Sequence, residues 1–233
     1  MLKNGTDFEK FATGHLNLPS TLVNQYENHI SSQYTGGMVA MTPSIIEERP
    51  MNVAVMSVFD RLMMDRIIYM GMGIDDQVAN VINAQLLYLE SIDKKKDVKM
   101  YLSSGGGSVY AGLGIYDTMQ AIGPDVATYN MGLCASMAFV LMVAGANGKR
   151  SALKHSRSMQ HQPMGGISPG TQASDMDITV REINKLKKEL YEIISFHTGQ
   201  DYDKVLSDCE RDYWMIAQEA KEYGAIDNVI GQK

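Results

Sequence analysis

Ser136 is the residue whose surroundings in the sequence most favour catalysis. It follows a short apolar segment and stands directly before the apolar stretch 137–146. A serine at the start of a helix has free backbone N–H groups and the positive end of the helix dipole beside it, and both stabilise a developing oxyanion. The N–H of Met137 would be the nearest such group. A serine that only caps a helix is the commoner case, and no GxSxG elbow surrounds this one.

A nucleophilic serine needs a histidine to accept its proton and a carboxylate to orient that histidine. The chain has five histidines: His15, His29, His155, His161 and His197. His161 is the best placed, because it ends the extended stretch 157–160 and the following Gln162-Pro163 breaks the element. The carboxylate stays open among the aspartates near the carboxyl end, which are Asp201, Asp203, Asp208, Asp212 and Asp227. No His, Cys, Asp or Glu cluster has metal-ligand spacing, so we expect no metal site.

The glycine-rich run 103–107, SSGGG, is a second candidate for chemistry. Glycines let the backbone approach a ligand closely, because no side chain blocks it. The alternatives are an oxyanion hole made by a backbone N–H, a phosphate cradle, or a simple tight turn between a strand and a helix. The run matches neither GxGxxG nor GxxxxGK[ST], which disfavours a nucleotide.

Strands and helices alternate from about residue 66 onward. Expected strands cover 66–70, 98–102 and 126–129, and an apolar helical pattern follows each of them, the first capped by Asp75. This alternation predicts an α/β fold with parallel strands joined by right-handed crossovers. Functional groups gather at the carboxyl ends of such strands, so loop 103–108 and a turn at 130–133 leading to Ser136 are the expected site.

The remaining segments predict further helices and a closing strand. Helices are expected over 175–196 and near 218–223, the second with Gly224 as its C-cap, and a last strand over 226–230. Residues 1–40 form a separate leader, which is either a mobile arm that packs on a neighbouring subunit or a removable pro-segment. Residues 41–233 form the main domain.

Composition excludes several classes of protein. The 233 residues carry 21 Lys+Arg and 27 Asp+Glu, a net charge of −6 with no basic stripe, so nucleic acid is not an expected partner. The longest apolar run is about half of the ~20 residues that a membrane span needs, so no membrane contact is expected. Only two cysteines, Cys134 and Cys209, argue for a reducing compartment, and the cytoplasm is the expected location.

The stretch that contains both the serine and the histidine closely resembles one protein family. GLCASMAFVLMVAGANGKRSALKHSRSMQHQPMGG is similar to the catalytic region of the proteolytic subunits of Clp protease, the ClpP family. SSGGGSVYAGLGIYDTMQ resembles that family's glycine loop and HTGQDYDKVLSDCERDYWMIAQEAKEYGAID its closing segment. The resemblance implies Ser136 as nucleophile, His161 as general base and Asp212 as orienting acid, with the N–H groups of Gly107 and Met137 as the oxyanion hole.

The resemblance also implies a fold and an assembly. The fold would be the ClpP/crotonase-like arrangement of repeated strand–helix units with a projecting handle between Gly165 and the long helix. The activity would be that of a serine endopeptidase that hydrolyses unfolded polypeptides inside two stacked heptameric rings. A Clp AAA+ ATPase would feed the rings and use the ATP, so no cofactor is expected in this subunit.

Departures from the family pattern keep two alternatives open. Gly105 stands where the family has proline, and Lys99, Ala121 and Ser151 stand where aromatic residues of the ATPase-docking pocket are usual. One alternative is therefore a non-catalytic or regulatory subunit of a mixed ring, and the other is an acyl-CoA enzyme of the crotonase fold. Cys134, two residues before the serine, is expected to be buried and unreactive.

Overall fold

A computed structural model describes residues 13–14, 19–21, 23, 44–49, 52–166, 168 and 170–231. The chain divides into two compact units, Met1–Arg61 and Leu62–Lys233. In the first unit, β1 (Ser44–Arg49) pairs antiparallel with β2 (Asn52–Ser57). Helix α3 (Val58–Met64) follows β2 and contains the boundary between the two units. Most of the leader 1–40 lies outside the described residues, so its separate role stays a prediction.

The larger unit is built on a seven-stranded sheet, as the alternating pattern predicted. Its parallel strands are β3 (Ile67–Met70), β4 (Val98–Ser104), β5 (Val126–Ala135), β6 (Arg150–Leu153) and β9 (Asn228–Ile230), in that order. β7 (Arg157–Gln160) also pairs parallel with β5, and β8 (Tyr213–Ile216) pairs antiparallel with β7.

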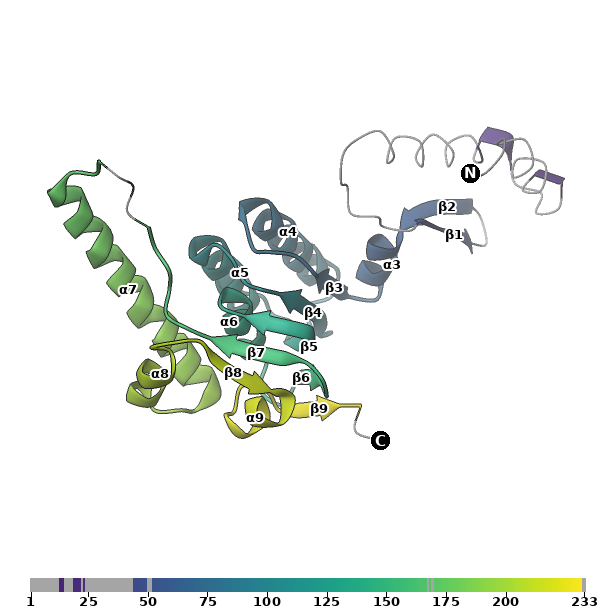
Figure 1. The fold of residues 1–233 in the computed structure, drawn as a ribbon. Helices are drawn as coiled ribbons and strands as arrows, with labels where there is room; N and C mark the ends of the chain where they lie inside the picture. Colours follow the sequence, from purple (N-terminus) through teal and green to yellow (C-terminus); the bar gives the residue numbers. More distant parts are fainter. Residues whose placement is uncertain are drawn as a thin grey trace, which may run out of the picture. The chain divides into compact units, whose positions relative to one another are not determined.

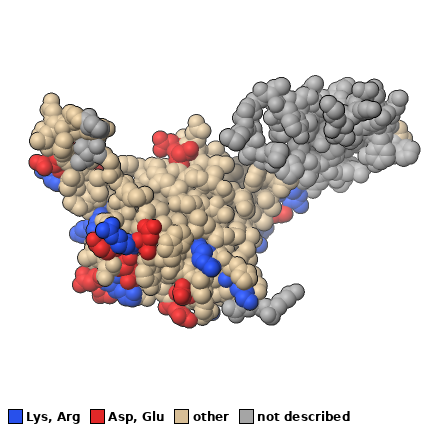
Figure 2. All heavy atoms as spheres, viewed as in Figure 1, with Lys and Arg blue, Asp and Glu red and all other residues tan. Residues whose placement is uncertain are grey.

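Helices cover the sheet and one of them extends beyond it (Figure 1). On the face seen in this view, Lys and Arg lie among Asp and Glu rather than in a patch of their own (Figure 2). They are α4 (Asp76–Ile92), α5 (Val109–Ala121), α6 (Met137–Val143), α7 (Ala173–Thr198), α8 (Tyr202–Asp208) and α9 (Ala217–Glu222). Asp75 caps α4 as predicted, because its carboxylate accepts the Val78 N–H. Every residue of α6 is buried, so the helix that follows Ser136 lies in the core rather than on the surface. Among the described residues, none of the helices has the length and apolarity to cross a membrane.

The predicted turn at 130–133 is wrong, because β5 continues through it to Ala135. The first half of β5 pairs with β6 and the second half with β7, so the strand changes partner where the turn was expected. Asn130 bridges this divergence: its Nδ2 donates to the Arg157 carbonyl and to Ser158 Oγ, and its Oδ1 accepts the Gly132 N–H. Asn130 is a typical turn residue in sequence, but in the structure its side-chain amide forms hydrogen bonds with backbone groups of β5 and β7.

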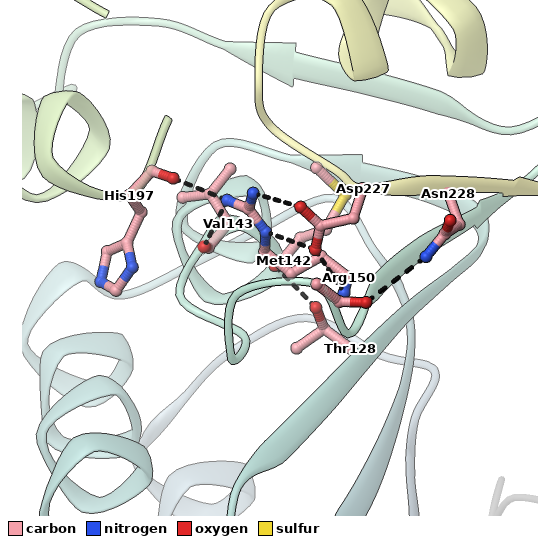
Figure 3. Close-up of polar contacts among 8 residues, drawn as sticks. Thr128, Met142, Val143, Arg150, His197, Asp227 and Asn228 are labelled. Atoms are coloured by element: carbon pink, nitrogen blue, oxygen red, sulfur yellow. Dashed lines mark hydrogen bonds and ion pairs between the residues drawn. The ribbon is translucent and has the colours of Figure 1, made fainter. Parts of the chain in front are cut away.

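A buried arginine fixes the far end of α6 (Figure 3). Arg150 Nη2 pairs with Asp227 Oδ1 at 2.7 Å, and Nη1 donates to the carbonyls of Val143 and His197 at 3.4 and 2.7 Å. The guanidinium thereby joins the last residue of α6 to the end of α7 and to the segment before β9. Burial of Asp227 opposes its ionisation, but hydrogen bonds to Arg150 and its charge outweigh that and hold the pKa of Asp227 below its ordinary value.

Candidate active site

Three side chains that are far apart in the sequence form one hydrogen-bonded chain. His161 Nε2 lies 2.8 Å from Ser136 Oγ, and His161 Nδ1 lies 3.2 Å from Asp212 Oδ1. All the residues involved belong to the larger unit. The order serine, imidazole, carboxylate is the geometry that lets a histidine remove a hydroxyl proton while a carboxylate holds the ring.

The antiparallel pairing of β7 and β8 places the carboxylate. Gln160 is opposite Tyr213 in the last registered pair, so one step further along each strand brings His161 beside Asp212. The Gln162 N–H also donates to the Cys209 carbonyl, which ties the segment after the histidine to the end of α8. The pairing register thus selects Asp212, a choice that spacing alone had left open.

The other predicted candidates have different surroundings. Asp201 accepts the Asp203 N–H at the start of α8, Asp208 pairs with Lys204, and Asp227 pairs with Arg150. His155 is exposed, and His197 Nε2 lies 3.1 Å from the Tyr116 hydroxyl. His15 and His29 lie outside the described residues.

Ser136 occupies a strained backbone conformation between β5 and α6. Its φ of 56° and ψ of −126° lie in a region that residues with a Cβ rarely adopt. The position is held because its N–H donates to the Met159 carbonyl of the neighbouring strand and its carbonyl accepts the Phe139 N–H of the helix. The serine therefore lies on a sharp strand-to-helix turn, although the chain lacks the GxSxG motif that is typical of such a turn.

The two predicted oxyanion donors belong to the start of α6 and to the glycine loop. Met137 is the first residue of α6, so its N–H has no acceptor within the helix. Gly107 forms an isolated parallel bridge with Ile74, in which the Gly106 carbonyl and the Ser108 N–H make the hydrogen bonds. The N–H of Gly107 itself then faces away from Ile74.

Gly106 permits the close approach of the glycine loop to the serine. A Cβ at this position would lie 2.7 Å from Ser136 Cβ and 2.6 Å from the Ala135 carbonyl oxygen. A Cβ at Gly107 would lie 2.1 Å from the Ile74 carbonyl oxygen. Both glycines also have positive φ, whereas a Cβ at Gly105 would meet nothing within 4 Å. Two of the three glycines are thus required by the site, and Gly105 is not.

A pocket opens beside the serine and the histidine, between α6 and α7. The space between its lining atoms is about 330 Å³ when the adjoining open solvent is included, and its enclosed part is small. Its lining residues are Val109, Ser136, Met137, Phe139, Val140, Gln160, His161, Pro163, Leu190 and Ile194. The predominance of apolar side chains suits a hydrophobic substrate group, and the presence of Gln160 is a feature that the sequence did not single out.

The remaining site predictions concern neighbouring groups. Cys134 is fully buried, as expected, and burial raises the pKa of its thiol. Lys99 and Ala121 are exposed, whereas Ser151 is buried within β6. Within the described part of the chain, no group of three or more His, Cys, Asp or Glu residues has a geometry that could hold a metal ion.

Comparison with known proteins decides the family. The sequence pattern of the Clp protease family matches residues 50–233, a range that includes Ser136, His161 and Asp212. The chain belongs to the Clp protease family. It is accordingly a serine endopeptidase, a hydrolase, with the α/β fold that its motifs predicted.

Several curated Clp protease subunits resemble the chain over nearly its whole length. An ATP-dependent Clp protease proteolytic subunit of Bacteroides fragilis is 59% identical over 227 residues, covering 97% of this chain and 99% of that protein. One of Porphyromonas gingivalis is 57% identical over 224 residues, covering 96% and 97%. An ATP-dependent Clp protease proteolytic subunit 1 of Salinibacter ruber is 42% identical over 215 residues, covering 92% and 89%.

Proposed function

We propose that Ser136, His161 and Asp212 carry out peptide-bond hydrolysis in this Clp protease subunit. His161 Nε2 takes the proton of Ser136 Oγ as the oxygen attacks the peptide carbonyl, and the ring later gives that proton to the leaving amine. Asp212 holds the imidazole in the tautomer that presents its free Nε2 lone pair to the serine. The 2.8 Å contact between His161 and Ser136 is the observation that carries the proposal.

The tetrahedral oxyanion is stabilised by the N–H groups of Gly107 and Met137. Both come from backbone that the fold has already positioned, one from the loop bridged to Ile74 and one from the start of α6. Such donors need no reorganisation during the reaction, and each contributes on the order of 10² to 10³ in rate. Water then cleaves the acyl-enzyme by the same steps in reverse.

Assembly into two stacked heptameric rings is part of the proposal. Four apolar side chains on the outer face of α4 are more than half exposed in the single chain: Val81, Leu87, Tyr88 and Ile92. Soluble monomers rarely expose so many large apolar groups on one helix, so a subunit contact is the expected use of this face. The relatives are named as subunits of an ATP-dependent protease, which supports a Clp AAA+ ATPase as partner.

The substrates follow from that assembly, because an enclosed chamber admits unfolded polypeptide that the ATPase supplies. The subunit itself needs no cofactor. Its location is the cytoplasm, as its two cysteines suggest. Removal of part of residues 1–40 during maturation belongs to the same proposal, as does docking of the ATPase despite Lys99 and Ala121. The non-catalytic ring subunit is disfavoured, because the three side chains that such a subunit would lose are present and hydrogen-bonded.

A fluorophosphonate probe and a peptide-cleavage assay test the proposal. The assembled wild-type protein is expected to react stoichiometrically at Ser136 and to cleave an unstructured fluorogenic peptide, and Ser136→Ala is expected to do neither. Native mass spectrometry of the same samples gives the ring size. Assembled rings that leave Ser136 unlabelled and the peptide intact would establish the regulatory subunit instead.

A further inference from the structure

A buried serine lies at the start of the glycine loop, residues 105–107. Ser104 is the last residue of β4, is 3% exposed and pairs with Cys134 of β5. Its Oγ accepts the N–H of Gly106 at 3.1 Å, inside the loop that the strand leads into. A hydroxyl that bonds to the backbone two residues further along holds a turn in one conformation. The first half of the glycine loop is thus held by a side chain of the sheet.

Two hydrogen bonds hold two successive peptide groups of this loop. The bond from the Gly106 N–H to Ser104 holds the peptide group that joins Gly105 to Gly106. The bond from the Ile74 N–H to the Gly106 carbonyl, at 2.9 Å, holds the next peptide group, which joins Gly106 to Gly107. In a trans peptide the N–H points opposite to the carbonyl, so this second bond also sets the direction of the Gly107 N–H.

The bond to Ser104 matters because the glycines do not hold the loop by themselves. Gly105 is exposed, and a Cβ there would meet nothing within 4 Å, so packing does not restrain the backbone at that position. Gly106 has a φ of 95°, a value that glycine leaves as readily as it adopts. Without the bond to Ser104, the peptide group between Gly105 and Gly106 can rotate, and the Gly107 N–H then changes its direction.

The glycine loop lies against the turn that carries the nucleophile. A Cβ on Gly106 would lie 2.7 Å from Ser136 Cβ and 3.0 Å from the Met137 nitrogen. The two proposed oxyanion donors, Gly107 and Met137, therefore belong to neighbouring backbone segments. A donor stabilises the oxyanion only if its direction is set before the reaction, so a rotation of the loop lowers the rate.

We propose that Ser104 is a positioning residue of the reaction, which holds the Gly107 N–H in the direction of the oxyanion through its bond to the Gly106 N–H. This inference rests on the proposed function of Ser136 and its oxyanion donors. The Ser104 side chain is buried and is not part of the lining of the pocket beside Ser136, so it acts on the rate through the loop.

Ser104→Ala in the assembled protein tests this role. For an unstructured fluorogenic peptide, kcat is expected to fall about 5- to 30-fold, the ratio that one lost buried hydrogen bond represents, with little change in KM. The affinity for a peptide boronate, which forms a tetrahedral adduct with Ser136, is expected to fall by the same factor as kcat/KM. A wild-type kcat, or a loss confined to KM, overturns the proposal.

A double substitution tests whether Ser104 acts through Gly107. A Cβ at Gly107 would lie 2.1 Å from the Ile74 carbonyl oxygen, so Gly107→Ala already displaces the donor. Adding Ser104→Ala to Gly107→Ala is expected to lower kcat by less than about twofold further, because the group that Ser104 positions is already out of place. Losses that multiply would show that Ser104 affects the rate by another route, and the proposal would then be wrong.

Ser156→Ala is the matched control for stability. Ser156 is 2% exposed, and its hydroxyl donates to the Leu153 carbonyl at 2.7 Å in the turn between β6 and β7. Its substitution removes a buried bond between a serine and the backbone away from the glycine loop. It is expected to lower the urea unfolding midpoint about as much as Ser104→Ala and to keep kcat within about twofold of wild type. Equal losses of kcat in the two variants would mean that lost stability is responsible, which overturns the proposal.

Active-site titration distinguishes failure of this inference from failure of the proposed function. Each variant is first labelled to completion with a fluorophosphonate, and rates are expressed per labelled serine. Ser104→Ala protein that labels fully and keeps the wild-type kcat refutes only the role of Ser104, whereas wild type that neither labels nor cleaves refutes both. If Ser104→Ala does not assemble, Ser104→Cys, which fills the same space with a weak acceptor, is expected to show the same loss of kcat.

Discussion

The two sides of His161 are built in different ways. On the serine side, Nε2 contacts a hydroxyl that is fixed by a strained backbone, a strand hydrogen bond and a fully buried helix. On the acid side, His161 Nδ1 lies 3.2 Å from Asp212 Oδ1, and the Asp212 side chain is 59% exposed. The imidazole is 12% exposed. The nucleophile is thus placed by the core, and the acid by a strand edge that faces solvent.

This difference has an energetic consequence. A contact with a solvent-exposed carboxylate is weakened by water and salt, whereas Ser136 is half-buried and its backbone is held by hydrogen bonds to Met159 and Phe139. Substitutions on the serine side are expected to remove the chemistry, and those on the acid side to reduce it.

Ser136→Ala is expected to lower kcat by at least about 10⁴-fold, because no other group forms the acyl-enzyme. The fold is expected to persist, since among the described residues the lost hydroxyl forms a hydrogen bond only with His161 Nε2, and the alanine Cβ occupies the same place. Single-turnover peptide cleavage measures the loss, and the unfolding midpoint serves as the control. Residual activity above about 1% would mean that the serine side of the comparison is mistaken.

Asp212→Asn is expected to have the next largest effect, with a loss of kcat about one to two orders of magnitude smaller than that of Ser136→Ala. The asparagine keeps the shape but favours the wrong imidazole tautomer. Cleavage rates of both variants under identical conditions give the comparison. Equal losses in the two variants would show that the exposed acid is as essential as the nucleophile. Asp212→Glu serves as the partial rescue.

The same contrast explains what the sequence could predict. Ser136 and His161 each follow a strand, so local pattern and the rule about carboxyl ends of strands identified both as candidates. Asp212 could not be found that way, because the pairing of Gln160 with Tyr213 decides it and neither segment carries a sign of that register. Only the family motifs identified it before the structure was known.

The failures have a common physical cause, which is contact between distant residues. Asn130 resembles a turn residue in sequence, but its partners Arg157 and Ser158 lie more than 25 residues further along and extend β5 instead. The strain at Ser136 is set by its neighbours in β7 and α6 rather than by a glycine beside it. Gln160 was not predicted as a pocket residue, because the sequence around a single glutamine does not indicate that its side chain is buried.

Gly107→Ala tests whether the backbone on the serine side is as rigid as the comparison requires. The new Cβ would lie 2.1 Å from the Ile74 carbonyl oxygen, so the loop must shift and its oxyanion N–H with it. A loss in kcat of about 10²- to 10³-fold is expected. Gly105→Ala is the matched control, because open space surrounds that position, and its kcat is expected to stay within about twofold of wild type. Equal effects of the two substitutions would indicate a loop that adapts freely.

Asp227→Asn examines the support at the far end of α6. It leaves Arg150, which is 6% exposed, without its counter-charge, and the expected loss in unfolding free energy at pH 7 is about 3 kcal/mol. The pKa of Asp227 is lowered in the folded protein, so its contribution is complete above the unfolded pKa of about 3.9 and is lost as pH falls through the lower folded value. Urea unfolding of both proteins at pH 7 and pH 3 is expected to show a larger difference at pH 7 than at pH 3. A difference of equal size at the two pH values would mean that lost packing is responsible rather than lost charge.

The smallest expected effect is the alkylation of Cys134 in the native protein. It tests how well the core behind Ser136 is packed. Its side chain is fully buried, and burial raises its pKa, as burial also raises the pKa of Cys209 to about 12. Iodoacetamide at pH 8 is expected to leave both thiols unmodified in the native protein and to modify both after guanidinium unfolding, as counted by intact mass. Fluorophosphonate labelling of Ser136 in the same native sample is the control for a folded site. Rapid alkylation of Cys134 in the native protein, with Cys209 still protected, would show that the core behind Ser136 is loosely packed. The serine side of His161 would then be no more rigid than the acid side, where the carboxylate is exposed.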